Sequence, residues 1–459
     1  MIFKNISKTK ISLALISLVI TFFVWQQGLR DSLSRPSVSF DISQTEQEIA
    51  ELAIPSIPIK LKKFLITNDP VDEINNLLSQ VSFNELTERN KLIRIISSES
   101  NAFKIDKNIP KEFKNKNYNL LIKEIEKKSN NNLYKPNSDK FDLFKDDRFL
   151  YHLLSKELDF DDSSLITKSF SSKMFLKILA IRFIPLVTIL IGSILALKTL
   201  WKVIYLKKFG WKEIEPLELE LIDMVLLIAG GFVVLGEVVS PLFSITLVEL
   251  FSKNISNELS QSLKIFFGYL FMAIPPLLIV YYQVKSVKGE FILKKDYFQF
   301  KFASIKHAII YGIKGWLTIV PFVLLISVIM NSLIDNQNGS NPLLEIVLNN
   351  KNYFSFIILF ATTTLLAPFF EEIIFRGILL PTLSRDFGVI WGIIVSAFIF
   401  ALAHLSIGEM PPLFVLGIGL GITRIVSGSL LSSVIMHSLW NGLTLSLIHI
   451  SEPTRRDQI

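Results

Sequence analysis

The sequence predicts an all-α fold: a polytopic bundle of about eight or nine transmembrane helices with an N-terminal extramembrane region that is mostly helical. Half of the 459 residues are hydrophobic and the mean hydropathy is +0.45, values that are typical of multi-pass membrane proteins. The apolar residues also gather into separate stretches, most of them near the roughly 20 residues that cross the hydrocarbon core. One long polar region interrupts this pattern near the N-terminus.

The first stretch, Ile11–Trp25, follows three lysines and lacks a small-residue cleavage site after it. We therefore interpret residues 1–27 as an uncleaved signal anchor. Residues 28–173 are rich in Lys, Glu, Asn, Asp and Ser. Helical apolar spacing at Phe83–Ser97 and Tyr118–Lys128 predicts a small extramembrane domain there, and we find no catalytic motif in it.

The remaining expected spans follow in order, with accessory spans in residues 174–345 and a core carrying polar motifs in residues 346–450. The last but one is short, so we expect it to be tilted, broken or re-entrant. The spans are Ile181–Leu197, Leu221–Phe243, Leu263–Tyr282, Ile309–Met330, Tyr353–Leu383, Val389–Ile407, Pro412–Val426 and Leu430–Ile448. Residues 451–459 break abruptly with this composition. The run Leu447–Arg455 resembles translated adapter sequence, so we expect a non-native tail and give His449 no role.

Lysines in the loops predict the orientation. Five follow the second span and six follow the fourth, and short loops rich in Lys and Arg stay in the cytoplasm. We expect residues 28–173 to be extracytoplasmic, on the opposite side of a membrane that we take to be a prokaryotic cell membrane, with an internal membrane as the alternative. The net charge of +7 is explained by such lysines, so we expect the lipid bilayer as a partner and no nucleic acid. The lysines are Lys198, Lys202, Lys207, Lys208 and Lys212, then Lys285, Lys288, Lys294, Lys295, Lys301 and Lys306.

Three motifs place ionisable groups inside the most apolar third of the chain. A charge at the bilayer centre costs about 2.5–3.5 kcal/mol or more, so such groups are expected to meet each other or water. Together they look like a hydrolytic site. The motifs are Glu371-Glu372-x-x-x-Arg376, Phe400-x-x-x-His404 and His437-x-x-x-Asn441.

The spacing within the first motif suggests a division of roles. Glu372 and Arg376 are four residues apart, so they share a helix face and can pair. Glu371 is rotated by about 100° and points elsewhere, which leaves it free to act as a base. A buried ion-pair cluster that only orders the helices explains the same spacing equally well.

The two histidine motifs also have structural alternatives. His404 lies one turn after Phe400, and a single histidine in a membrane helix is often an interhelical hydrogen-bonding group. His437 and Asn441 share a face and can stabilise an oxyanion, or they can join helices. The first of three separate spans carries an acidic residue, the second a histidine, and the third a histidine together with an amide. This joint occurrence favours catalysis.

Other polar or small residues are better explained by structure. Gly417-x-x-x-Gly421 indicates close helix packing. Glu237, in the third span, is a possible lining residue, although a hydrogen bond at a kink explains it better. His152 stands alone in the polar region, where a surface or core histidine is expected. The chain has no Cys, no H-E-x-x-H and no G-x-S-x-G, which argues against thiol, zincin and common serine hydrolases.

The three motifs, in this order, resemble those of the CPBP family of intramembrane proteases. The family includes type II CAAX prenyl endopeptidases and bacterial Abi-type, bacteriocin-processing and immunity proteins. The resemblance covers roughly Tyr353–Leu447, whereas the first five spans agree only in general character. It implies an intramembrane endopeptidase that acts on a membrane-associated peptide or protein.

The resemblance also implies a role for each motif residue. One carboxylate and one histidine would activate the water that attacks a peptide carbonyl. The second histidine and the amide would stabilise the oxyanion, and the remaining residues would support the site. In that order they are Glu371 and His404, His437 and Asn441, and then Glu372, Arg376 and Phe400.

The metal requirement and two rival functions stay open at this point. Glu371, His404 and His437 are a set that would ligate zinc, and they would equally serve a metal-free mechanism, which we favour slightly. One rival is a non-proteolytic scaffold or immunity protein with the same fold. The other is an ion-coupled transporter, which the lack of an evident internal repeat disfavours.

Overall fold

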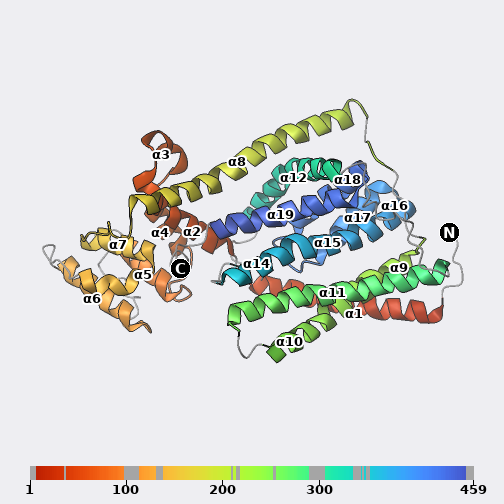
Figure 1. Cartoon of the computed structure of the whole chain (residues 1–459), viewed down its shortest axis with the longest axis horizontal. Helices are drawn as coiled ribbons and strands as arrows, with labels where there is room; N and C mark the ends of the chain where they lie inside the picture. The colour runs from red at the N-terminus through yellow and green to blue at the C-terminus, as the bar shows by residue number, and fades with distance from the viewer. Residues whose placement is uncertain are drawn as a thin grey trace. The chain divides into compact units, whose positions relative to one another are not determined.

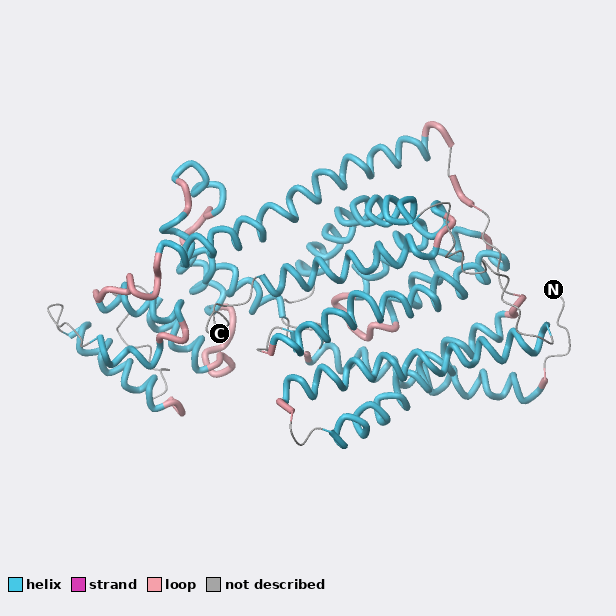
Figure 2. Tube along the Cα trace, viewed as in Figure 1, coloured by secondary structure: helices cyan, strands magenta, loops and turns pink. Residues whose placement is uncertain are grey.

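The computed structural model describes residues 7–35, 38–97, 113–130, 138–207, 210–212, 218–251, 255–288, 305–333, 343, 346–347 and 352–450. Within these residues every regular element is helical and no strand is present, which confirms the predicted fold class (Figures 1 and 2). The chain divides into two compact units. We call residues 1–38 with 187–446 the membrane unit, and residues 39–186 with 447–459 the polar unit. The expected non-native tail, residues 451–459, lies outside the described residues.

The membrane unit contains most of the apolar helices. They are α1 (Lys8–Ser34), the C-terminal part of α8 (Lys168–Ile204), α9 (Leu221–Val225), η3 (Leu226–Val239), α10 (Ser240–Phe251), α11 (Asn257–Lys288), α12 (Ile305–Leu333), α14 (Tyr353–Ala361), η5 (Thr362–Leu366), α15 (Ala367–Glu372), η6 (Ile373–Leu379), α16 (Leu380–Phe387), α17 (Val389–Leu402), α18 (Met410–Ser427) and α19 (Leu430–Ile450). Several of them follow one another without a break, as in the stretch from α14 to α16 (Figure 1).

Seven helices of the described chain are long and apolar enough to cross a membrane. Six of them correspond to the first six expected spans, and the seventh is α18, which corresponds to the expected span Pro412–Val426. The two other expected spans are helices too: α17 has 14 residues and α19 has 21. The protein is therefore an integral, multi-pass membrane protein. Much of the second lysine-rich loop, residues 289–304, lies outside the described residues, as does Lys208.

Close helix packing and local irregularity shape the core around the motifs. A Cβ atom on Gly417 of α18 would lie 2.9 Å from the Cβ of Ala397 on α17, so the small residue lets these helices approach, as the Gly417-x-x-x-Gly421 spacing predicts. The segments η5 and η6 are π-helical and flank α15. Short π-helical segments inside α-helices are frequent at functional sites.

The polar unit is a small helical domain with its own hydrophobic core. It contains α2 (Val38–Ala53), η1 (Ile54–Ser56), α3 (Ile59–Leu65), α4 (Pro70–Ser79), α5 (Glu88–Ser97), α6 (Lys116–Asn130), η2 (Ser138–Phe144), α7 (Arg148–Leu158) and the first part of α8. Helix α6 confirms the helical segment that apolar spacing predicts at Tyr118–Lys128. Helix α5 covers only the part of the predicted segment Phe83–Ser97 from Glu88 onward, because residues 83–87 form a turn rather than helix.

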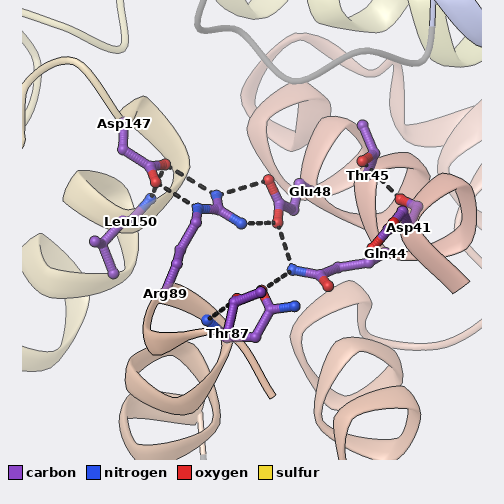
Figure 3. Close-up of polar contacts among 9 residues, drawn as sticks. Asp41, Gln44, Thr45, Glu48, Thr87, Arg89, Asp147 and Leu150 are labelled. Carbon is purple, nitrogen blue, oxygen red and sulfur yellow. Dashed lines mark hydrogen bonds and ion pairs between the residues drawn. The ribbon is translucent and has the colours of Figure 1, made fainter. Parts of the chain in front are cut away.

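An arginine at the centre of the polar unit joins three of its segments (Figure 3). Arg89 of α5 donates to Glu48 of α2 at 2.7 and 3.0 Å, and to Asp147, which precedes α7, at 2.5 and 3.0 Å. Gln44 donates to Glu48 and to Asn90 at 2.9 Å each. A planar guanidinium matches two carboxylates in this way, which an ammonium group does not.

Candidate active site

The two adjacent glutamates lie at the end of α15 and are both buried. Glu372 is fully buried, and its Oε1 accepts a hydrogen bond of 2.9 Å from Nη1 of Arg376, which is itself 1% exposed. The pair expected from the spacing is therefore present. The second guanidinium nitrogen, Nη2, donates to the carbonyl of Gly417 at 3.2 Å, so the same arginine ties η6 to α18.

His437 of α19 lies between the two carboxylates. Its Nδ1 is 3.1 Å from Oε1 of Glu372, and its Nε2 is 3.9 Å from Oε2 of Glu371. This Oε2 atom is buried and has no hydrogen-bond partner among the described residues. A separation of 3.9 Å is too long for a direct hydrogen bond and suits a bridging water.

The end of α17 differs from the expected span. The apolar run Val389–Ile407 predicts one helix, yet the helix stops at Leu402 and His404 lies in the following turn. Leu405 has a φ of 50°, a left-handed conformation that costs a non-glycine residue about 1–2 kcal/mol and cannot continue the helix. Strain of this kind often accompanies functional sites.

A hydrogen bond still fixes the position of His404. Its Nδ1 is 2.8 Å from the carbonyl oxygen of Phe400. A carbonyl only accepts, so Nδ1 carries the proton, and in the neutral ring Nε2 keeps its lone pair. The Phe400 ring is fully buried and contacts His404, His437 and Arg376. Its centroid lies 4.8 Å from the ring centroid of His404, 5.6 Å from that of His437 and 4.3 Å from Cζ of Arg376. Phe400 therefore links the three motifs through one side chain.

Asn441 lies one helical turn beyond His437 on α19. Its side-chain amide donates to the carbonyl of Thr363 in η5 at 2.9 Å. An amide nitrogen has two N–H donors, so this bond orients the group and leaves a second donor. The structure thus brings Glu371, Glu372, Arg376, Phe400 and both histidines together, with Asn441 held at the neighbouring turn.

The first helix of the chain supports the turn that carries His404. The backbone N–H of Ile407 donates to Oγ of Ser32 in α1 at 3.2 Å. A Cβ atom on Gly28 would lie 2.8 Å from Cδ1 of Leu405, so a glycine at this position leaves room for the strained leucine. The apolar pattern of Ile11–Trp25 predicts a membrane helix but gives no sign of this role.

A third glutamate belongs to the surroundings of the site. Glu237 of η3 and Tyr269 of α11 are near enough to Glu371 to interact with it electrostatically. Oε2 of Glu237 is buried and has no hydrogen bond within the described residues. The sequence shows only that Glu237 lies inside an apolar span, four residues before Pro241, and this does not reveal its proximity to Glu371.

Comparison with known families adds an independent result. Residues 353–443 match the family described as type II CAAX prenyl endopeptidase Rce1-like. We call this segment, which is similar to that family, the Rce1-like domain. Residues 39–176 match a domain of unknown function, DUF8675. A search of the curated proteins found no match, and a search of the solved structures found none either.

The Rce1-like domain contains every residue of the three motifs. It begins at α14 and ends within α19, so it includes both π-helical segments and the turn after α17. The match agrees with the resemblance inferred from the motifs. The other match covers most of the polar unit and carries no statement of activity.

The described residues do not form a metal-ion site in this arrangement. No group of three His, Asp or Glu side chains in this part of the chain is placed to hold a metal. Nδ1 of His437 contacts Glu372 and Nδ1 of His404 donates to a backbone carbonyl, so only the Nε2 atom of each ring is left for a ligand. The alternative zinc set of Glu371, His404 and His437 is thus not assembled, and we derive no metal-dependent step.

Proposed function

We propose that the protein is an intramembrane endopeptidase that hydrolyses peptide bonds of membrane-associated proteins or peptides by activating a water molecule. One observation carries the proposal: inside the Rce1-like domain, a buried and unpartnered oxygen of Glu371 lies 3.9 Å from Nε2 of His437. A carboxylate with this free lone pair, beside a second polar group, is what a general base for water requires.

In the proposed reaction, Glu371 and His404 activate the attacking water: Glu371 takes one proton from it, and Nε2 of His404 accepts a hydrogen bond from its other O–H group. The Nε2 lone pair of His404 supports this, because its Nδ1 is committed to the Phe400 carbonyl. The hydroxide adds to the peptide carbonyl and forms a tetrahedral oxyanion. When the C–N bond breaks, the departing amine receives the proton that the base had taken.

His437 and Asn441 are proposed to stabilise the oxyanion. Glu372 accepts from Nδ1 of His437, so donation from Nε2 to an oxyanion requires the doubly protonated ring. Asn441 retains one N–H beyond the bond to Thr363. Glu372, Arg376 and Phe400 would act as positioning residues, because they orient His437 and His404 through the contacts described above.

The direct test is cleavage by purified full-length protein in lipid nanodiscs, with a library of membrane-tethered peptides as substrates. Glu371→Gln keeps the shape of the side chain and removes the base, so the rate should fall by about 10²–10⁴. Glu249→Gln is the matched control, because Glu249 is an exposed glutamate of the same unit with a 60% exposed side chain. Its rate should be unchanged.

A specific pattern of results would favour the scaffold or immunity function instead. In that case no peptide in the library is cut, and cells with Glu371→Gln behave as wild type while deletion of the gene changes them. If peptides are cut, trapping with Glu371→Gln followed by mass spectrometry of captured peptides identifies the substrate.

A further inference from the structure

A short helix of the polar unit carries apolar and basic side chains on one outward face. Helix α3 is attached to the core by Leu65, which is 2% exposed, and by Leu61. On its other side, Ile59 is 90% exposed and Phe64 is 54% exposed. The seven-residue helix therefore presents two bulky apolar side chains on its exposed side.

Three lysines lie between these apolar side chains. Lys60, Lys62 and Lys63 are exposed, and none of them forms an ion pair with another described residue. Lysines in the last turn are favourable for the helix dipole, which accounts for two of the three positions. The dipole does not account for Lys60 or for the exposure of Ile59. Such a surface can bind a bilayer, because burial of the apolar side chains and attraction of the lysines to anionic lipids both favour binding.

A ring contact places α3 beside the start of the charge-free stretch of α8. The rings of Phe64 and Phe183 have centroids 5.3 Å apart, and the two helices lie side by side in Figure 1. Phe183 begins a charge-free stretch of α8 that runs to Leu197. Arg182, directly before it, pairs with Glu46 at 2.8 Å. An arginine at the end of an apolar stretch marks the boundary of the hydrocarbon.

We propose that α3 binds the surface of the bilayer, with its two exposed apolar side chains at the boundary of the acyl chains and its three lysines on anionic phospholipid headgroups. The length of α3 permits this. At 1.5 Å per residue its seven residues span about 10 Å, so all of it lies close to the level set by Phe183. The positive charge of α3 and the negative charge of the headgroups are complementary.

The absence of cysteine makes a direct test possible. Ile59→Cys, labelled with a polarity-sensitive fluorophore in the full-length protein, reports contact with lipid. Nanodiscs contain either phosphatidylcholine alone or a mixture with phosphatidylglycerol, and both contain a lipid with a quencher on its upper acyl chain. Leu120→Cys on α6, labelled with the same fluorophore, is the matched control, because Leu120 is also an aliphatic side chain of the polar unit and is 58% exposed.

We expect stronger quenching at position 59 than at position 120, and a further increase with phosphatidylglycerol. Changing Lys60, Lys62 and Lys63 to Glu should lower the ratio of bound to free α3 by on the order of a hundredfold or more, and high salt should lower it as well. Changing the three lysines to Gln gives a milder loss. Lys114, Lys116 and Lys123, exposed lysines of the same unit, are changed to Glu as the charge-matched control and should have no effect.

Two results would overturn the proposal. Equal quenching at positions 59 and 120 would mean that α3 does not lie on the bilayer. If quenching at position 59 does not change with phosphatidylglycerol, with salt or with the lysine substitutions, then α3 does not bind anionic headgroups.

Discussion

At the scale of single residues, Glu372 is held by partners from two directions. Arg376 reaches it from the next turn, and His437 reaches it from α19. Neither Glu372 nor Arg376 has appreciable contact with the surface, so each side chain compensates the charge of the other. Removing one member of such a pair costs much more than its net contribution, because the other charge stays buried.

Arg376→Ala tests this coupling through stability. The variant leaves a buried carboxylate without its cation, so we expect the free energy of unfolding to fall by about 3–5 kcal/mol. Unfolding in detergent micelles, followed with denaturant, gives the value. Lys264→Ala is the control, because Lys264 pairs with Glu249 at the surface and should cost at most about 1 kcal/mol. Equal losses in the two variants would contradict the buried-pair interpretation.

Asn441→Ala tests the proposed oxyanion donor. Loss of one such donor typically lowers the rate by about 10²–10³, so kcat should fall to that extent. Within the described residues, the side chain of Asn441 makes one hydrogen bond, to a backbone carbonyl, and the loss of this bond should leave the protein folded. The readouts are kcat in nanodiscs and the melting temperature of the same sample. A variant that keeps full activity would remove Asn441 from the proposed mechanism.

These contacts show which parts of the site the sequence encodes locally. Glu372 and Arg376 lie on one continuous helical stretch, so a spacing of four residues is enough to predict their contact. The contact between His437 and Glu372 joins positions 65 residues apart and depends on how α19 packs, which no local pattern specifies. The same limit hides the proximity of Glu237 to Glu371.

At the scale of elements, the helix boundaries and irregularities are the least predictable features. Hydropathy locates α17 but not its end, because Leu405 is apolar while its backbone is left-handed. Hydropathy also cannot distinguish η5 and η6 from α-helix, since the side chains of both kinds of segment are equally apolar. The helices themselves follow from apolar length, which is why the bundle is predictable and its bends are not.

Helix α7 provides an element with a defined pH response. Its His152 is buried, as expected for a core histidine, with Nδ1 2.6 Å from Asp162 and Nε2 3.4 Å from Glu51, which also contacts Lys156. Burial alone would lower the pKa of His152, but its hydrogen bonds to Glu51 and Asp162 outweigh burial and raise the pKa. Burial likewise opposes the charge of Glu51, but hydrogen bonds from His152 and Lys156 lower its pKa.

The signs of these shifts predict where α7 is most stable. A raised histidine pKa contributes stability that is complete below the ordinary value of 6.5 and is lost as the pH rises through the folded-state pKa. A lowered glutamate pKa contributes stability above 4.5 that is lost at more acidic pH. We expect greatest protection of α7 amides between about pH 4.5 and 6.5, and less at pH 8. Hydrogen exchange corrected for intrinsic rates measures this, and His152→Gln should remove the loss above 6.5.

At the scale of the whole molecule, two segments of the chain match two different family models. The Rce1-like domain lies in the membrane unit, and the domain of unknown function covers most of the polar unit. The two are joined through α8, whose N-terminal turns belong to the core of the polar unit while its later residues form an apolar span. We propose that the polar unit lies outside the cytoplasm, where it would meet substrates or lipid on the far side from the lysine-rich loops.

The cysteine-free chain permits a direct test of this orientation. Lys123→Cys places a thiol on α6 of the polar unit, and Lys202→Cys places one near the end of α8, in the first lysine-rich segment; both lysines are exposed. A single span separates them, so a membrane-impermeant maleimide should label position 123 in intact cells and position 202 only after permeabilisation. The physical reason is that lysine-rich segments beside a span are retained in the cytoplasm. The unsubstituted protein gives no background because it has no thiol. The reverse pattern would invert the topology, and labelling of both positions in intact cells would mean that α8 does not cross the membrane.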